Sequence, residues 1–177
     1  MKVLFLAAVE FELACARALR TGTDDVFMCS GMGPAATRSA LSEALSAGTF
    51  DLVVDVGVAG SYDPDRFPVG SVVQVVREFE SGRRESVLVN PAPPALFASL
   101  PQVTGNTVPA LEARYRGVPA DIETMEGAAF FDVCLRRGVP FAEIRAVSNR
   151  VGEEDRSRWD IPLALRNLTA ILQSPCI

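Results

Sequence analysis

The chain has 177 residues, a formal net charge of −5 and no histidine. Its length suits one domain with a substantial core, so we expect a single domain over residues 1–177. The charge argues against nucleic acid as a partner, no apolar run approaches the roughly 18 residues of a membrane span, and the lack of histidine excludes Ser-His-Asp and Cys-His catalysis.

Strand and helix patterns alternate along the chain. Short apolar and β-branched runs predict strands, and apolar residues at helical spacing predict helices. In chain order we expect a strand over 2–8, a helix over 10–19, a strand over 25–29, a helix over 34–47, strands over 52–56, 71–76 and 86–89, a short helix within the loop 90–101, a helix over 125–137, a strand over 141–147 and a helix over 159–172. This alternation predicts an α/β fold with a largely parallel sheet, which binds ligands beyond the carboxyl ends of its strands.

Two acidic residues, Glu10 and Glu12, follow directly on the first predicted strand. Acids suit the first turn of a helix, where backbone N–H groups are unpaired and the helix dipole is positive. Either acid could instead be a catalytic base at the carboxyl end of a strand. Residues two apart do not share a helix face, so only one of the pair can point into a site.

The segment GMGPAA, residues 31–36, fits the glycine fingerprint of dinucleotide-binding proteins. Asp55 lies 22 residues past Gly33, which is the spacing of the acid that binds the ribose in such proteins. The segment follows the second predicted strand, however, and Asp55 leads directly into another glycine-containing segment. Glycines in a tight strand–helix turn are the simpler explanation, and a dinucleotide-binding oxidoreductase stays an alternative.

Three further motifs lie where strands end or helices begin. DVGVAGSYD, residues 55–63, places Gly57 and Gly60 in an expected turn where backbone N–H groups can approach a ligand. Glu126 opens a helix of small residues, where a carboxylate can meet a ligand hydroxyl. Asn149 carries an amide that donates and accepts together, as the edge of a 6-oxopurine requires. Taken alone, each motif also has an ordinary structural explanation.

Together and in this order, the segments resemble the purine nucleosidase and nucleoside phosphorylase superfamily, which contains methylthioadenosine/S-adenosylhomocysteine nucleosidase. The resemblance spans nearly the whole chain and is carried by the opening strand with its glutamates, SGMGPAA, VVDVGVAGSYD with VGSVVQV, IETMEGAAFFDVC and FAEIRAVSN. MEGAAFF, IRAVSNRVG and WDIPLAL further resemble the futalosine hydrolases, a family of menaquinone biosynthesis. The resemblance implies a three-layer α-β-α sandwich around a central mixed, mostly parallel sheet. The chain is shorter than most relatives, mainly between residues 80 and 121.

The resemblance also implies catalytic residues. It selects Glu12, rather than Glu10, as the base that activates water. Asn149 stands where adenine-specific nucleosidases carry an Asp that helps to protonate the leaving base. An amide cannot deliver a proton in that way, but it can hold a hypoxanthine ring, whose own carbonyl stabilises the departing charge. The substitution therefore favours a 6-oxopurine over adenine.

The substrate-binding residues implied by the resemblance come from two segments. Glu126 would bind the ribose hydroxyls, with Met125 packed on the sugar. Val58, Ala59 and Gly60 would lie along the ribose and the base.

The resemblance leaves hydrolysis and phosphorolysis to be distinguished. A phosphorylase holds phosphate with backbone N–H groups and arginines, and residues 7–10 and 53–56 lack the arginines that phosphorylase relatives carry there. We therefore expect hydrolysis of the N-glycosidic bond of futalosine, giving hypoxanthine and dehypoxanthine futalosine. The nearest alternative is another purine nucleosidase, such as methylthioadenosine/S-adenosylhomocysteine or aminodeoxyfutalosine nucleosidase. A non-catalytic nucleoside-binding protein is a third possibility.

We expect no metal and no organic cofactor. The four cysteines form no C-x-x-C pair, and without histidine the usual zinc sites are missing. Free thiols and the lack of a secretory signal favour a reducing cytoplasm. The expected partners are a small-molecule nucleoside and further copies of the chain, as a dimer or larger homo-oligomer, with no nucleic acid and no membrane. Phe130, Phe131 or Trp159 could serve such an interface, although core packing explains each equally well.

Overall fold

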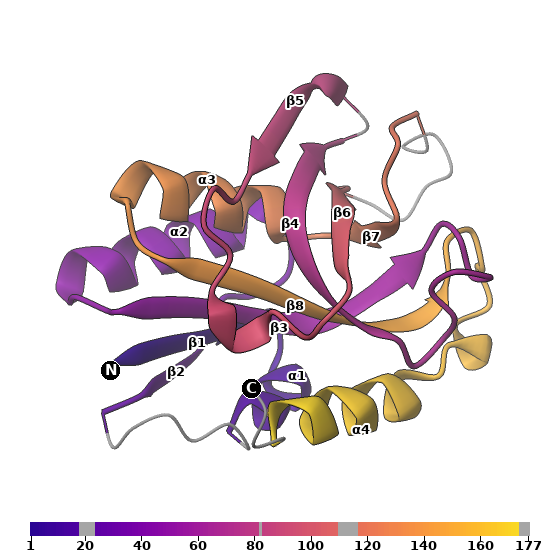
Figure 1. Ribbon diagram of the computed structural model, residues 1–177, viewed down its shortest axis with the longest axis horizontal. Helices are drawn as coiled ribbons and strands as arrows, with labels where there is room; N and C mark the ends of the chain where they lie inside the picture. The colour runs from indigo at the N-terminus through magenta and orange to yellow at the C-terminus, as the bar shows by residue number, and fades with distance from the viewer. Residues whose placement is uncertain (18–23, 82, 110–116, 174–177) are drawn as a thin grey trace.

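The computed structural model describes residues 1–17, 24–81, 83–109 and 117–173 (Figure 1). These residues form eight β-strands, four α-helices and two short 3₁₀ helices (η). The elements are β1 (Val3–Ala7), α1 (Glu10–Ala16), β2 (Val26–Cys29), α2 (Pro34–Ala47), β3 (Leu52–Ser61), β4 (Val72–Glu80), β5 (Arg83–Val89), η1 (Ala95–Phe97), β6 (Gln102–Thr107), β7 (Ile122–Thr124), α3 (Gly127–Arg137), β8 (Phe141–Arg150), η3 (Arg156–Arg158) and α4 (Ile161–Leu172).

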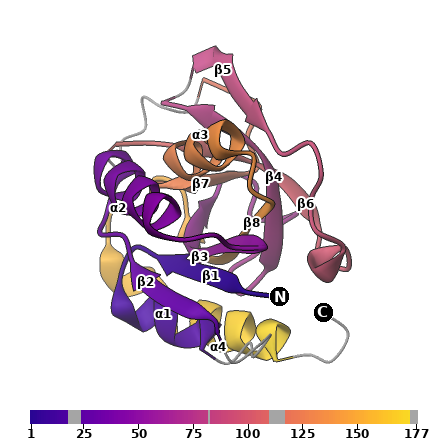
Figure 2. The same cartoon turned by 90° about the vertical axis from the view of Figure 1, so that its left-hand side faces the viewer.

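Helices cover both faces of the sheet around β1, β3 and β8, which are parallel to one another. Successive side chains of a strand point to opposite faces. Val3 and Phe5 of β1 accordingly belong to an apolar cluster with α1 and α4, and Leu4 and Leu6 belong to a second cluster with α2 and α3. Figure 2 shows α2 and α3 on one side of β1, and α1 and α4 on the other.

Five of the strands close on themselves. β8 pairs with both β3 and β4, β4 pairs with β6, and β7 pairs with both β6 and β3. β1 and β2 extend the sheet from β3, and β5 lies beside β4. The predicted α/β fold with a mixed sheet is confirmed, but a plain three-layer sandwich does not describe this closure. Sequence periodicity indicates which segments are strands, and it does not indicate which strands pair.

Most elements lie where the sequence predicts them, and α2 has the predicted bounds. β3 and β8 run further than expected, each to ten residues. The predicted glycine turn at 57–60 is wrong, because these residues continue β3, with a bulge between Ala59 and Gly60. β6 and β7 were missed, since the first is polar and the second has three residues. α1 ends at Ala16, and positions 18–19 of the predicted helix lie outside the described residues.

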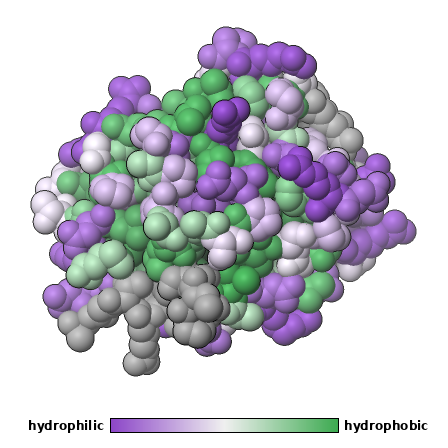
Figure 3. Space-filling view, viewed as in Figure 1, coloured by the Kyte–Doolittle hydropathy of each residue, from purple (hydrophilic) through white to green (hydrophobic). Residues whose placement is uncertain are grey.

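On the face shown in Figure 3, apolar and hydrophilic residues are interspersed across the middle, and hydrophilic residues gather along the upper and right-hand edges. Within the described ranges, no helix combines the length and the apolar character that crossing a bilayer demands.

Candidate active site

A pocket of about 250 Å³ lies at the carboxyl-terminal parts of β1, β3 and β8. This is the edge of a parallel sheet at which α/β proteins bind ligands. Every site residue predicted from the sequence lines it: Glu12, Val58, Ala59, Gly60, Met125, Glu126 and Asn149. Segments that are far apart in the chain therefore meet at one pocket.

Glu12 points into the protein, whereas Glu10 points to solvent. Both lie in the first turn of α1, but Glu12 is 6% exposed while Glu10 forms an exposed ion pair with Arg17. The backbone N–H of Val58 donates to Oε1 of Glu12 at 2.9 Å. Burial raises the pKa of Glu12, and the Val58 N–H and the Arg145 guanidinium only partly oppose this effect. A carboxylate with a raised pKa is a stronger proton acceptor, which suits a general base.

Glu126 lines the pocket and also contacts the glycine-containing segment 31–36. It is the residue that precedes α3, and its Oε1 accepts a hydrogen bond from the N–H of Gly33 at 2.8 Å. Gly33 has a φ of +87°, a conformation that favours glycine. A carboxylate thus occupies the N-terminus of α2, where a dinucleotide-binding protein would hold phosphate. Asp55, the other part of that fingerprint, is buried and paired with Arg145, so it is out of reach of a ribose.

Asn149 lies near the end of β8, and both the oxygen and the nitrogen of its side-chain amide form hydrogen bonds. Its Oδ1 accepts from the hydroxyl of Ser148 at 2.8 Å, and its Nδ2 donates to the carbonyl of Arg150 at 3.1 Å. The side chain is 7% exposed. A Cβ built on Gly60 would lie 3.2 Å from Nδ2 of Asn149 and 3.0 Å from Val151. Gly60 therefore provides the space into which this amide fits.

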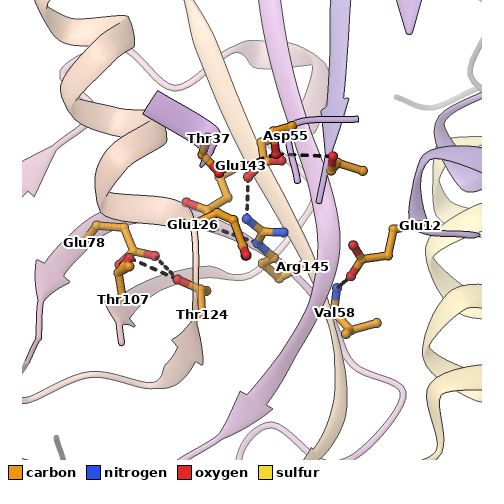
Figure 4. A network of polar contacts seen from close by, with 12 residues as sticks. Glu12, Thr37, Asp55, Val58, Glu78, Thr107, Thr124, Glu126, Glu143 and Arg145 are labelled. Atoms are coloured by element: carbon orange, nitrogen blue, oxygen red, sulfur yellow. Dashed lines mark hydrogen bonds and ion pairs between the residues drawn. The ribbon is translucent and has the colours of Figure 1, made fainter. Parts of the chain in front are cut away.

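A buried ion-pair network lies behind Glu12 (Figure 4). Arg145 pairs with Asp55 and, through Nε at 2.7 Å, with Glu143. A Cβ on Gly57 would collide with Nη1 of Arg145 and lie 3.0 Å from Oε1 of Glu12, so guanidinium and carboxylate approach each other at this glycine. Burial lowers the pKa of Arg145, but the surrounding carboxylates raise it by more, so the guanidinium stays charged.

Glu78 is a further buried acid next to this network. It accepts hydrogen bonds from the hydroxyls of Thr107 at 3.0 Å and Thr124 at 3.1 Å. A Cβ on Gly127 would collide with Glu78 and lie 2.8 Å from Oε2 of Glu143, so the two carboxyl groups are close neighbours. Burial, together with the Glu143 carboxylate, raises the pKa of Glu78 well above its usual range. The protonated form of Glu78 is therefore favoured more than in a solvent-exposed glutamate.

Comparisons with known proteins decide the family. The model of the Phosphorylase superfamily matches residues 91–174. Over 175 aligned positions, the chain is 31% identical to the futalosine hydrolase of Streptomyces coelicolor, with 80% of this chain and 74% of that protein covered. The chain belongs to the futalosine hydrolase family.

Other members of the futalosine hydrolase family are similar over more of their length. The Thermus thermophilus futalosine hydrolase is 29% identical over 195 aligned positions, which cover 93% of this chain and 86% of that protein. The native structure of the Helicobacter pylori futalosine hydrolase has a TM-score of 0.84 and 15% identity, with 98% of this chain and 96% of that chain covered. At that identity, the structural likeness shows a shared fold.

Several pocket residues of this member of the futalosine hydrolase family were not found from the sequence. The additional lining side chains include Phe11, Met32, Glu123, Arg156, Trp159 and Ile161. Trp159 is thus part of the pocket wall, whereas Phe130 and Phe131 are fully buried in the core. Arg145 was also missed. Its signal was available, because Glu143 and Arg145 stand two apart in an apolar strand and so share one face.

We expect Glu78→Gln to flatten the pH dependence of stability. A carboxyl whose pKa is raised by folding stabilises the fold fully below its unfolded pKa near 4.5, and this contribution is lost as pH rises towards the folded value. From about pH 5 upward, wild-type protein should lose about 1.4 kcal/mol of unfolding free energy per pH unit relative to the variant. Urea denaturation over a pH series measures this. Glu80→Gln, on the same strand and only partly buried, is the control, and parallel curves for Glu78→Gln and wild type would contradict the assignment.

Proposed function

We propose that the protein hydrolyses the N-glycosidic bond of futalosine and releases hypoxanthine and dehypoxanthine futalosine. One observation carries the proposal: in a chain of the futalosine hydrolase family, Glu12, Glu126 and Asn149 line the same pocket. The buried carboxylates at the inner part of this pocket repel an inorganic anion, which supports water as the nucleophile.

In the proposed reaction, water attacks C1′ of the ribosyl group while the bond between C1′ and the purine nitrogen breaks. Glu12 accepts a proton from the water, and the water oxygen forms the new bond to C1′. The electron pair of the broken bond leaves with hypoxanthine, which takes up a proton from solvent, and Glu12 afterwards releases its proton to solvent. Positive charge develops on the sugar in the transition state, and carboxylates fixed beside it stabilise that charge.

The other pocket residues position the substrate in this proposal. Glu126 binds the 2′- and 3′-hydroxyls with the oxygen that does not accept from Gly33. Met125 packs on the sugar, and the segment 58–60 lies along the ribose and the base. Holding the reacting groups in place contributes to the rate in addition to the general base.

Product identification tests the proposal. Purified protein is incubated separately with futalosine, inosine and methylthioadenosine in phosphate-free buffer. The products are separated by chromatography and identified by mass spectrometry. We expect hypoxanthine and dehypoxanthine futalosine from futalosine. A requirement for phosphate with formation of a ribosyl phosphate would overturn hydrolysis. Faster release of adenine from methylthioadenosine would favour the alternative nucleosidase, and binding without release of base would favour a non-catalytic binding protein.

We expect Asn149→Asp to shift the base preference towards adenine. The carbonyl of Arg150, 3.1 Å from Nδ2 of Asn149, would face a carboxyl oxygen in the variant. That contact and burial both favour the protonated carboxyl, which can donate a proton to a leaving adenine. The measurement is the ratio of kcat/KM for methylthioadenosine to that for futalosine, and we expect a rise of about tenfold or more. An unchanged ratio would remove Asn149 from base selection.

We also propose that the protein forms a homo-oligomer, a dimer or larger, and works in the cytoplasm. Phe11 and Met32 are 53% and 71% exposed at the pocket, and a second copy of the chain could cover these apolar side chains. Cys15, Cys29 and Cys134 are free thiols, as a reducing compartment favours.

A further inference from the structure

Charge is distributed unevenly around the pocket. Among the described residues that line it, three carry carboxylates, Glu12, Glu123 and Glu126, and only Arg156 carries a cation. Glu12 and Glu126 are buried, whereas Arg156 is exposed. The inner part of the pocket therefore favours neutral or cationic ligand groups, and an anionic group on the ligand is favoured beside Arg156.

Arg156 is held in place without being neutralised. Its guanidinium lies over the ring of Trp159, with 5.7 Å from Cζ to the ring centroid, within the range of a cation–π contact. The indole Nε1 donates to the carbonyl of Glu153 at 3.0 Å, which fixes the ring. Within the described part of the chain, the neighbouring acids Glu153 and Asp155 pair with Arg158, and no ion pair is formed by Arg156.

The segment that carries Arg156 folds back onto the site. The N–H of Asp160 donates to the carbonyl of Ser148 at 2.9 Å, and the Asp160 side chain accepts from the N–H of Leu163 at the start of α4. These two bonds place Trp159 next to the end of β8, beside Asn149. Arg156 and Trp159 thus form one wall of the pocket opening.

The substrate's three parts can be assigned to three depths of the pocket. In the proposed function, the purine meets the buried Asn149, and the sugar lies between the buried Glu12 and Glu126. The remaining arm leaves through the opening, where the lining side chains are exposed. There it meets Phe11 and Met32, which suit an aromatic ring, and the unpaired guanidinium of Arg156.

We propose that Arg156 binds the carboxylate at the end of the substrate's aromatic arm. The proposal rests on the proposed function, because the non-purine arm of futalosine is a benzoate. A guanidinium recognises a carboxylate through two parallel hydrogen bonds. Trp159 positions the guanidinium, and the apolar residues at the opening hold the ring.

The test compares futalosine with its carboxamide analogue, which has the same shape and no charge. In wild-type protein we expect kcat/KM to be about 10- to 100-fold higher for futalosine than for the carboxamide. Arg156→Gln should bring this ratio close to one, mostly through KM for futalosine. Arg156→Lys keeps the positive charge but loses the planar guanidinium that donates two parallel hydrogen bonds, so it should restore part of the ratio.

The control is Arg158→Gln, because Arg158 is exposed, pairs with Glu153 and Asp155 and is not among the residues that line the pocket. It should leave the ratio at its wild-type value. A wild-type ratio near one, or an unchanged ratio in Arg156→Gln, would overturn the subsite while leaving futalosine hydrolysis intact. If wild-type protein does not release hypoxanthine from futalosine, the proposed function fails, and the subsite fails with it.

Discussion

Glu12→Gln should lower kcat by about 10²- to 10⁴-fold while the protein stays folded and still binds nucleoside. Glutamine has the shape of glutamate, and its carbonyl can still accept from the N–H of Val58, which donates to Oε1 at 2.9 Å. The amide cannot accept a proton from water, so only the chemical step is affected. Steady-state kinetics with futalosine and a separate binding titration distinguish the two effects.

Glu10→Gln is the matched control, since Glu10 lies in the same helical turn but is exposed. The pH profile gives a second readout. Because Glu12 acts as a base only when ionised, kcat/KM should fall as pH drops through its raised pKa, above the ordinary value of 4.5. The residual activity of Glu12→Gln should lack this fall. Turnover within a few-fold of wild type would remove Glu12 from the mechanism.

Arg145→Met should destabilise the fold by about 3–5 kcal/mol, as expected when one partner of a buried ion pair is removed. The guanidinium is 1% exposed and contacts both Asp55 and Glu143, which are equally buried. Burial raises the pKa of both acids, and Arg145 opposes this shift. Without Arg145, each acid must take up a proton or gain solvent. Urea denaturation at neutral pH measures the loss.

Neutralising the acids should recover much of this stability. We expect the triple variant Arg145→Met, Asp55→Asn, Glu143→Gln to be clearly more stable than Arg145→Met alone, a coupling that independent sites would not show. Arg66→Met is the surface control, because the Arg66–Asp121 pair is solvent-exposed on the arginine side and is worth about 1 kcal/mol or less. If Arg145→Met cost no more than Arg66→Met, the network would not support the fold.

Local pattern was enough to predict most elements, and the family resemblance indicated residues that line the pocket. The bounds of α2 followed from helical spacing after a glycine, and the choice between Glu10 and Glu12 followed from helix geometry with the family resemblance. Strand closure could not be predicted, because the pairing of β8 with β4 depends on residues about 70 positions apart, such as Val72 and Ala146. The polar strand β6 was missed because it lacks an apolar alternation that would mark it.

The missed polar residues share a different cause. A sequence gives the charge of Glu78 but not the groups that face it, so its burial beside Glu143 could not be predicted. For Arg145, the spacing to Glu143 indicates that both side chains lie on one face of the strand, but it does not indicate the pairing with Asp55. Arg156 and Trp159 lay in a segment that reads as loop and helix start. Their position in the pocket involves long-range contacts such as the backbone hydrogen bond from Asp160 to Ser148, which no local pattern predicts.

The bond from Gly33 to Glu126 has a consequence for enzymology. One carboxylate anchors the loop before α2 and also faces the pocket, so altering Glu126 releases a backbone amide as well as changing the ligand contact. Kinetic losses in such a variant would mix loop displacement with lost sugar recognition. Deleting single hydroxyls from the nucleoside, with Glu126 intact, isolates the second contribution.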